Sequence, residues 1–293
     1  MKLHIAFYLA LIILLTTSCH SERPIDGKLV EDDLGRKVII PHHPERILGL
    51  NPSSTEMLFA ICPEENIVGR TQNCNYPEAA IKKPVVSNYP VDPEHILKIN
   101  PDLIVAVEGI ISLQDAQKIQ QMGIPVYFQK FKNVEDVFVN LMKLGEITGN
   151  IDKANYVVDS LRKELQNFQI NNPSRYLPKV LYLIWTDPIY AFGSHSIMTD
   201  KLRVAGAINI IDSSFKKESP ELTREYILSK SPDVLLCGFD NPEKQLFDQY
   251  PEFRNMEFYR RKRVYIPTDD LQSRPGPRIV EAIKELHRLI HEE

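Results

Sequence analysis

The chain has 293 residues, enough for one large domain or two of medium size. Its hydrophobic content of 43% and charged content of 25% are those of an ordinary globular protein. The formal net charge of −4 gives no reason to expect a nucleic-acid partner, because such partners attract strongly basic proteins.

The N-terminus has the pattern of an export signal. Ile5–Leu15 is an apolar run of eleven residues behind a positive charge, and it is too short to span a membrane. We therefore predict a signal peptide over residues 1–18. Small residues then precede Cys19, as in bacterial lipoproteins, where that cysteine receives lipid and becomes the mature N-terminus. Ordinary secretion with cleavage nearby is the alternative. The lipoprotein interpretation makes residues 19–27 a lipid-anchored tether.

Three cysteines remain beyond the predicted lipidation site: Cys62, Cys74 and Cys237. Because three is an odd number, at least one thiol is unpaired or pairs outside the chain. Cys62 and Cys74 could form a disulfide, which the sequence alone does not decide. No cysteine or histidine group has zinc-site spacing, and the pair His42-His43 is typical of a solvated loop.

Strand and helix patterns alternate in the first half of the chain. They are a strand at 46–50, a helix from Glu56, a helix at 92–100, a strand at 103–107, a helix at 114–122 and a strand at 125–128. The helix start at Asp92 is strong, since Asp is a good N-cap and Pro93 fits the first helical position. Pro101 ends that helix. Such alternation is typical of a parallel sheet covered by helices on both faces.

The middle of the chain differs, because it has two helical segments between residues 133 and 169 and no strand pattern. The second segment has apolar residues at three- and four-residue spacing and is about 30 Å long. The alternating pattern then resumes. It comprises strands at 179–184, 234–237 and 263–266, and helices at 196–205, from 223, and at 277–291.

Two segments, 131 residues apart, share one pattern. The segments starting at Glu94 and at Glu225 both read Glu-x-Ile-Leu-x-x-x-Pro-Asp, followed by three apolar residues. A repeat at this distance indicates two similar lobes, with a ligand cleft between them. We therefore predict an α/β fold of two Rossmann-like lobes with parallel sheets, over residues 28–149 and 172–293. A single long helix over residues 150–171 would join them.

Several short motifs carry a family resemblance. They are Arg46 to Glu56, Val68-Gly69, Asn75-Tyr76-Pro77, both repeats, Gly206-Ala-Ile-Asn209 and Arg274-Pro-Gly-Pro-Arg278. In order and spacing they resemble the substrate-binding proteins of ABC importers for cobalamin, iron-siderophores and haem, in which one helix joins two lobes. The resemblance, strongest to cobalamin-binding members, implies a protein that is not an enzyme. It would capture a metal chelate outside the cell membrane, facing the periplasm, and deliver it to a permease and its ATPase.

The resemblance also implies roles for single residues. Glu94 and Glu225 match the surface glutamate with which each lobe docks on permease arginines. Taken alone, a glutamate in a first helical turn is explained by the helix dipole. Aromatic cleft walls suit a macrocycle, although tyrosines are also common in cores. The implied cleft residues are Asn73, Tyr76, Tyr89, Trp185, Tyr190 and Arg274. His195 could ligate a chelated metal, although a lone loop histidine seldom does.

Some positions depart from the cobalamin-binding pattern. Asn73, Val107 and Ser219 replace aromatic residues, and Ala205 and Leu286 replace a cysteine pair. An iron-siderophore or haem is therefore the alternative ligand. A secreted α/β enzyme or a lipid-tethered sensor is the alternative function, although the chain has no Gly-x-Ser-x-Gly, glycine-rich phosphate loop or His-Glu-x-x-His motif. We expect a monomer without a covalent cofactor.

Overall fold

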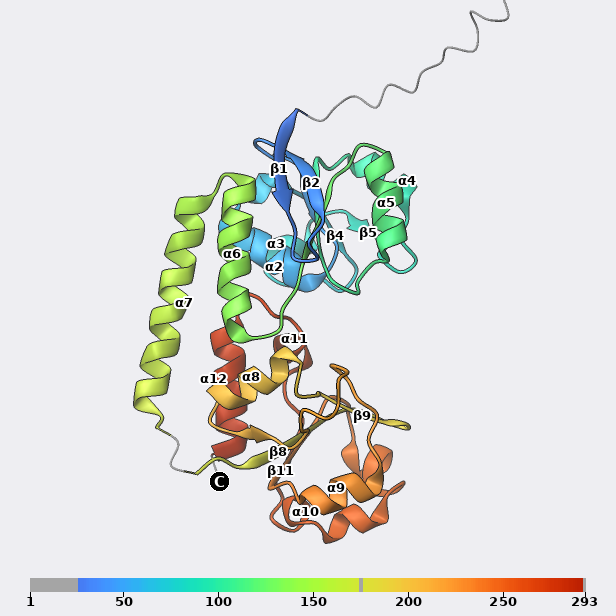
Figure 1. Ribbon diagram of the computed structural model, residues 1–293, viewed down its shortest axis with the longest axis vertical. Coiled ribbons are helices and arrows are strands. Elements are labelled where there is room, and N and C mark those ends of the chain that lie inside the picture. The colour runs from blue at the N-terminus through green and yellow to red at the C-terminus, as the bar shows by residue number, and fades with distance from the viewer. Residues whose placement is uncertain (1–25, 174–175, 292–293) are drawn as a thin grey trace, which may run out of the picture.

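The chain forms two α/β lobes, and helix α7 (Ile151–Asn171) runs alongside both (Figure 1). The computed structural model describes residues 26–173 and 176–291. Each lobe is built on a five-stranded sheet. The predicted fold of two lobes with parallel sheets joined by one long helix is confirmed. The predicted signal peptide and Cys19 lie outside the described residues.

The sheet of the N-terminal lobe is parallel throughout, in the order β5-β4-β3-β6-β7. Its strands are β3 (Ile47–Gly49), β4 (Ile67–Thr71), β5 (Val85–Val86), β6 (Leu103–Val107) and β7 (Val126–Gln129). The direction in which strands are added reverses between β3 and β6. In open α/β sheets, ligands bind beyond the carboxyl ends of the strands at such a switch point.

Five helices cover this sheet: α2 (Pro52–Ile61), α3 (Glu78–Ile81), α4 (Pro93–Ile99), α5 (Leu113–Gln121) and α6 (Val134–Thr148). A 3₁₀ turn spans Glu64–Asn66. The prediction that α2 starts at Glu56 is wrong. The helix starts four residues earlier, with Pro52 in the first helical position. Proline is favoured there because that position needs no N–H hydrogen bond within the helix and the ring clashes with no preceding helical turn.

An antiparallel hairpin of β1 (Gly27–Glu31) and β2 (Lys37–Pro41) precedes the sheet and was not predicted. The carboxylate of Asp32 closes its turn by accepting the backbone N–H groups of Leu34, at 3.0 Å, and Arg36, at 2.9 Å. The adjacent Asp33 donates its N–H to the carbonyl of Phe128 in β7. The hairpin is therefore attached to the edge of the first lobe.

The C-terminal lobe repeats the arrangement. Its strands are β8 (Lys179–Thr186), β9 (Ile189–Ala191), β10 (Ile208–Asn209), β11 (Val234–Cys237) and β12 (Val264–Tyr265). The order β10-β8-β11-β12 is parallel, and β9 pairs antiparallel with β8. The helices are α8 (Ile197–Val204), α9 (Arg224–Lys230), α10 (Glu257–Arg260), α11 (Asp269–Gln272) and α12 (Ile279–His291), with short helical turns at Glu243–Phe247 and Pro251–Asn255.

The Pro-Asp halves of the sequence repeat have the same structural role in both lobes. The carboxylate of Asp102, beside β6, accepts the backbone N–H of Arg46, at 3.1 Å, just before β3. The carboxylate of Asp233, beside β11, accepts the N–H of Lys179, at 2.7 Å, at the start of β8. Because β6 pairs with β3 and β11 with β8, each aspartate holds the start of the neighbouring central strand.

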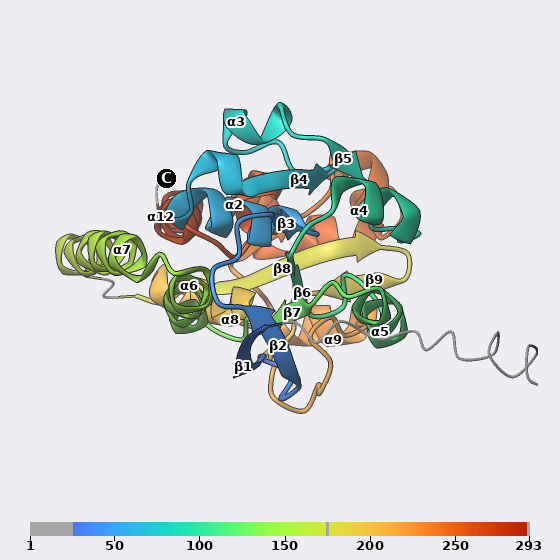
Figure 2. The same ribbon diagram turned by 90° about the horizontal axis from the view of Figure 1, so that it is seen from above.

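The two lobes share an apolar core on the side of α7. One cluster of buried residues includes Leu141 and Leu144 of α6 together with Leu202 of α8 and Ile283 of α12. α7 packs against α6, α2 and α12, and Figure 2 shows it at the outer edge of both lobes. The positions of the lobes are therefore set by packing as well as by the connecting helix.

Candidate functional site

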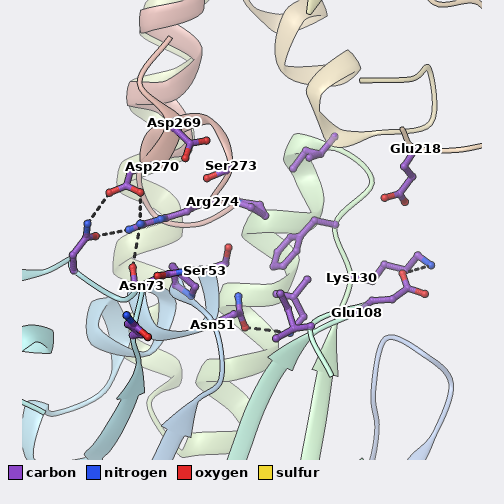
Figure 3. Close-up of a pocket in the computed structure, with 18 residues that line it drawn as sticks. Asn51, Ser53, Asn73, Glu108, Lys130, Glu218, Asp269, Asp270, Ser273 and Arg274 are labelled. Atoms are coloured by element: carbon purple, nitrogen blue, oxygen red, sulfur yellow. Dashed lines mark hydrogen bonds and ion pairs between the residues drawn. The ribbon is translucent and has the colours of Figure 1, made fainter. Parts of the chain in front are cut away.

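A pocket of about 710 Å³ lies between the lobes (Figure 3). Its N-terminal wall follows the carboxyl ends of β3, β4, β6 and β7, so it occupies the switch point of the first sheet. Segments around α8 and α11 form the opposite wall. The lining residues are Asn51, Pro52, Ser53, Gln72, Asn73, Asn75, Val107, Glu108, Ile110, Lys130, Phe131, Ile197, Glu218, Asp269, Asp270, Ser273, Arg274 and Pro275.

A buried polar network supports the base of this pocket. The side-chain oxygen of Asn51 accepts the hydroxyl of Ser54, at 2.8 Å, and the backbone N–H of Val107, at 3.2 Å. The Ser54 hydroxyl also lies 3.0 Å from Oε1 of Gln129. These contacts tie the start of α2 to β6 and β7. They also occupy the oxygen with which an N-cap asparagine would ordinarily accept a helix N–H.

A buried carboxylate joins the two lobes beside the pocket. Glu56 of α2 accepts two hydrogen bonds from Arg278, from Nε at 2.8 Å and from Nη2 at 2.7 Å, and a third from Nη1 of Arg274 at 3.3 Å. We call these three residues the interlobe clamp. The hydrogen bonds to Glu56 raise the pKa of Arg278. The Arg278 guanidinium also stacks 4.3 Å from the ring centroid of Tyr76.

Arg274 lines the pocket, but protein groups surround its guanidinium (Figure 3). Besides Glu56, it donates to Oδ1 of Asn75 at 2.6 Å, to the backbone carbonyl of Asn73 at 3.1 Å, and to the carboxylate of Asp270. Its exposed fraction is 7%. These bonds brace the loop after β4, and the ligand contact that the resemblance implies for Arg274 stays a prediction.

The charges of the pocket are unevenly distributed. Lys130 pairs with Glu108 at 2.5 Å, and Arg274 pairs with Asp270, so both lining cations are neutralised. The carboxylates of Asp269 and Glu218 in the C-terminal wall have no hydrogen-bond or ion-pair partner within the described ranges. The pocket therefore presents exposed acidic groups on one wall only.

The aromatic residues predicted for the cleft do not line this pocket. Tyr76 lies under Arg278, and Tyr89 is 93% exposed in the segment between β5 and α4. Trp185 of β8 is 53% exposed and lies opposite Tyr190 of β9. His195 is exposed and also lies outside the lining. Of the six predicted cleft residues, the structure brings only Asn73 and Arg274 to the pocket.

Sequence reasoning assigned no role to several residues of the site, including Ser53, Glu56 and Asp269. One readable signal was present at Glu56, the only charged residue of α2, directly before the apolar run 57–61. Arg274 and Arg278 gave another, because they lie four residues apart around a Pro-Gly-Pro turn. Two cations at such spacing beside a buried acid are typical of an ion-pair network.

The three cysteines in the described part of the chain are free thiols. Cys62, Cys74 and Cys237 are buried and unbonded to one another, so the structure has no Cys62–Cys74 disulfide. Burial raises the pKa of Cys62 to about 11 and that of Cys237 to about 12, which suppresses thiolate chemistry. Within residues 26–173 and 176–291, no cluster of His, Cys, Asp and Glu could hold a metal ion, and no helix could cross a membrane.

The two repeat glutamates occupy matching exposed positions. Glu94 follows the N-cap Asp92 in α4, and Glu225 follows the N-cap Thr223 in α9. Hydrogen bonding to its backbone and to the Thr223 hydroxyl lowers the pKa of Glu225. Figure 1 shows α4 and α9 on the side of each lobe away from α7. Each lobe thus presents one exposed carboxylate, in a helix on its side away from α7.

The chain is similar to curated bacterial proteins along most of its length. An uncharacterized ABC transporter substrate-binding lipoprotein, YvrC of Bacillus subtilis, is 28% identical over 269 residues, which are 89% of this chain and 85% of that protein. The vitamin B12-binding protein of Photorhabdus laumondii is 24% identical over 247 residues, or 83% of this chain and 86% of its own.

Solved structures share the fold. A possible iron-binding, periplasmic solute-binding protein from Staphylococcus epidermidis superposes with a TM-score of 0.77 at 24% identity, over 85% of this chain and 99% of its own. A periplasmic haem-binding protein from Pseudomonas aeruginosa gives a TM-score of 0.73 at 20% identity, over 85% and 93%. Residues 47–271 match the sequence pattern of a single family. The chain belongs to the periplasmic binding protein family.

Proposed function

We propose that this protein captures a metal chelate in the pocket between its lobes and delivers it to the permease and ATPase of an ABC importer. The observation that carries the proposal is the pocket itself, which lies at the switch point of a parallel sheet and is enclosed by two lobes. Its volume of about 710 Å³ is in the range of sites for drug-sized ligands.

Cobalamin is the first candidate ligand, because a vitamin B12-binding protein is among the relatives that match most of the chain. An iron-siderophore or haem is the alternative, supported by the iron- and haem-binding proteins of the same fold. The lining favours the hydrophilic edge of such a chelate over its flat face, since Phe131 is the sole aromatic residue among the described lining residues.

A titration tests the proposal. Trp185 is the only tryptophan, so its fluorescence reports quenching by a bound corrin or haem without labelling. Purified protein is titrated with cyanocobalamin, haem and ferric hydroxamate and catecholate siderophores. Saturable quenching by one of them at micromolar concentration supports capture of a metal chelate. The proposal fails if none of these chelates binds in that range.

We also propose that Glu94 and Glu225 dock the two lobes on the permease. Both carboxylates are exposed, and each begins an equivalent helix. The shared apolar core and the interlobe clamp hold the lobes together, so the separation of the two carboxylates is well defined. Two such points give orientation as well as attraction toward arginines of the partner.

Lipid anchoring through Cys19 completes the proposal. The relative from Bacillus subtilis is named a lipoprotein, and the apolar run before Cys19 is typical of an export signal. Radiolabelled palmitate fed to expressing cells would label the wild-type protein and leave Cys19→Ala unlabelled. Equal labelling of both would contradict anchoring at this residue.

A further inference from the structure

The first turn of α2, in which Ser53 lines the pocket, has polar groups without a protein partner. Neither the backbone N–H of Ser53 nor that of Ser54 has a hydrogen-bond acceptor in the described part of the chain. The N-cap residue Asn51 cannot supply one, because its side-chain oxygen accepts Ser54 Oγ and the N–H of Val107. Two buried donors at a helix N-terminus thus remain available to a ligand.

The side chain of Ser53 is a second, independent observation. Ser53 lines the pocket and is only 5% exposed, yet its hydroxyl makes no hydrogen bond to any described residue. The Ser53 oxygen is not among the buried unpartnered side-chain atoms of the described residues, so it is open to the pocket and accessible to a ligand. Figure 3 shows Ser53 between Asn51 and Arg274 at the base of the pocket. The hydroxyl and the two N–H groups therefore form a cluster of donors at one end of α2.

Charge favours an anionic group at this cluster. α2 is 10 residues long and begins at Pro52. Because the positive end of a helix dipole is its N-terminus, that end lies beside Ser53. No carboxylate neutralises this end, because α2 has no acidic residue in its first turn. The nearby Asp270 and Glu108 are paired with Arg274 and Lys130. The unpaired acids, Asp269 and Glu218, belong to the opposite wall.

We infer that the first turn of α2 is an oxyanion subsite that binds a carboxylate or phosphate group of the chelate through the Ser53 hydroxyl and the N–H groups of Ser53 and Ser54. This inference rests on the proposed function for the identity of the ligand, but the subsite itself can be tested without it. The acidic wall formed by Asp269 and Glu218 then faces a neutral or cationic part of the same ligand.

The direct test uses simple anions as probes. Amide resonances of isotope-labelled protein are followed while inorganic phosphate or, separately, acetate is added, with chloride at equal ionic strength as the control. The variant Ser53→Asp places a carboxylate at the subsite, where the helix dipole favours it, and circular dichroism checks that the variant is folded. Ser229→Ala, in exposed α9, is the matched control.

The subsite predicts saturable shifts of the Ser53 and Ser54 amides in the wild type and in Ser229→Ala, and none in Ser53→Asp. Phosphate and acetate distinguish a phosphate-bearing chelate from a carboxylate-bearing one. Shifts with neither anion, or equal shifts in Ser53→Asp, would overturn the subsite.

A second arm separates the subsite from the proposed function. Cobalamin is compared with cobinamide, which lacks the phosphate-linked nucleotide, and haem with its dimethyl ester. Ser53→Ala should weaken binding of the acidic member of a pair about tenfold and leave the other unchanged. If no chelate binds while the anion shifts persist, the subsite stands and the proposed function fails. If both members of a pair bind equally and no anion shift occurs, the subsite fails and the proposed function stands.

Discussion

The carboxylate of Glu56, in the N-terminal lobe, is held by both Nε and Nη2 of Arg278, in the C-terminal lobe, at 2.8 and 2.7 Å. The side chain of Glu56 is 1% exposed, and that of Arg278 is 18% exposed. Such bidentate pairs constrain geometry as well as adding attraction. The pair therefore joins the lobes directly beside the pocket in which we propose that the ligand binds.

Removal of the Glu56 carboxylate should destabilise the protein strongly. Glu56→Ala removes the counter-charge of Arg278 and one of the two carboxylates that pair with Arg274. Because both arginine side chains are largely buried, we expect the free energy of unfolding to fall by about 3–5 kcal/mol. Glu65→Ala removes an exposed glutamate from the same lobe and should change it by less than about 0.5 kcal/mol. Urea unfolding measures both, and equal effects of the two variants would refute the role of the clamp.

The buried Lys201 of α8 should make stability depend on pH. Its exposed fraction is 2%, its Nζ donates to the backbone carbonyl of Gln272 at 2.8 Å, and burial lowers its pKa to about 7. Because the unfolded lysine binds a proton that the folded one rejects, stability falls as the pH falls from about 10 to about 7. Lys201→Met abolishes this dependence.

The free energy of unfolding of the wild type should therefore fall relative to that of Lys201→Met as the pH is lowered from about 10 to about 7. The slope is at most about 1.4 kcal/mol per pH unit. Urea unfolding at several pH values measures the difference directly. A difference that is constant across this range would mean that Lys201 is charged in the folded protein.

The two repeat aspartates should act locally and equivalently. Asp102→Ala removes the acceptor of the N–H groups before β3, and Asp233→Ala removes the acceptor at the start of β8. Each should cost about 1–3 kcal/mol and speed amide hydrogen exchange at its own strand start. Asp159→Ala, on the exposed face of α7, is the control. Unchanged exchange at both strand starts would show that the aspartates do not hold these strands.

Docking through the repeat glutamates should affect transport and not ligand binding. The double variant of Glu94→Ala and Glu225→Ala should lose most chelate uptake in cells while it keeps the affinity of the purified protein. Asp152→Ala with Asp159→Ala, at exposed positions of α7, removes the same charge from the opposite side of the molecule. Uptake that survives the glutamate changes would refute docking, and a loss of affinity would indicate a role in the cleft instead.

Much of the fold was predictable because its signals are local. The cap at Asp92, the helix stop at Pro101 and the apolar run over 103–107 each lie within a few residues, and the repeat then supplied the second lobe. The hairpin of β1 and β2 was missed, although Val38-Ile39-Ile40 is a β-branched run that follows an Asp-Asp turn with Gly35. That pattern was readable.

The site was less predictable, because its contacts join segments that are remote in sequence. Glu56 and Arg278 are separated by 222 residues, and no local pattern reveals which buried acid meets which cation. The aromatic predictions show the same difficulty. The family resemblance implied Tyr76 and Tyr89 as cleft residues, but the fold puts Tyr76 under Arg278 and leaves Tyr89 in solvent. Which face a side chain occupies depends on tertiary packing.

The central claim is that a chelate binds in the pocket between the lobes, and one comparison of affinities tests it most directly. Ile197, the first residue of α8, lines the pocket, so Ile197→Trp fills space that the chelate would occupy. Leu228→Trp adds the same ring at an exposed position of α9. Both variants are compared with the wild type by equilibrium dialysis against the chelate that the fluorescence titration identifies.

We predict that Leu228→Trp binds that chelate as the wild type does, and that Ile197→Trp binds it at least about tenfold more weakly while remaining folded by circular dichroism. Unchanged affinity in folded Ile197→Trp would contradict the account, because it would show that the chelate binds outside the pocket between the lobes.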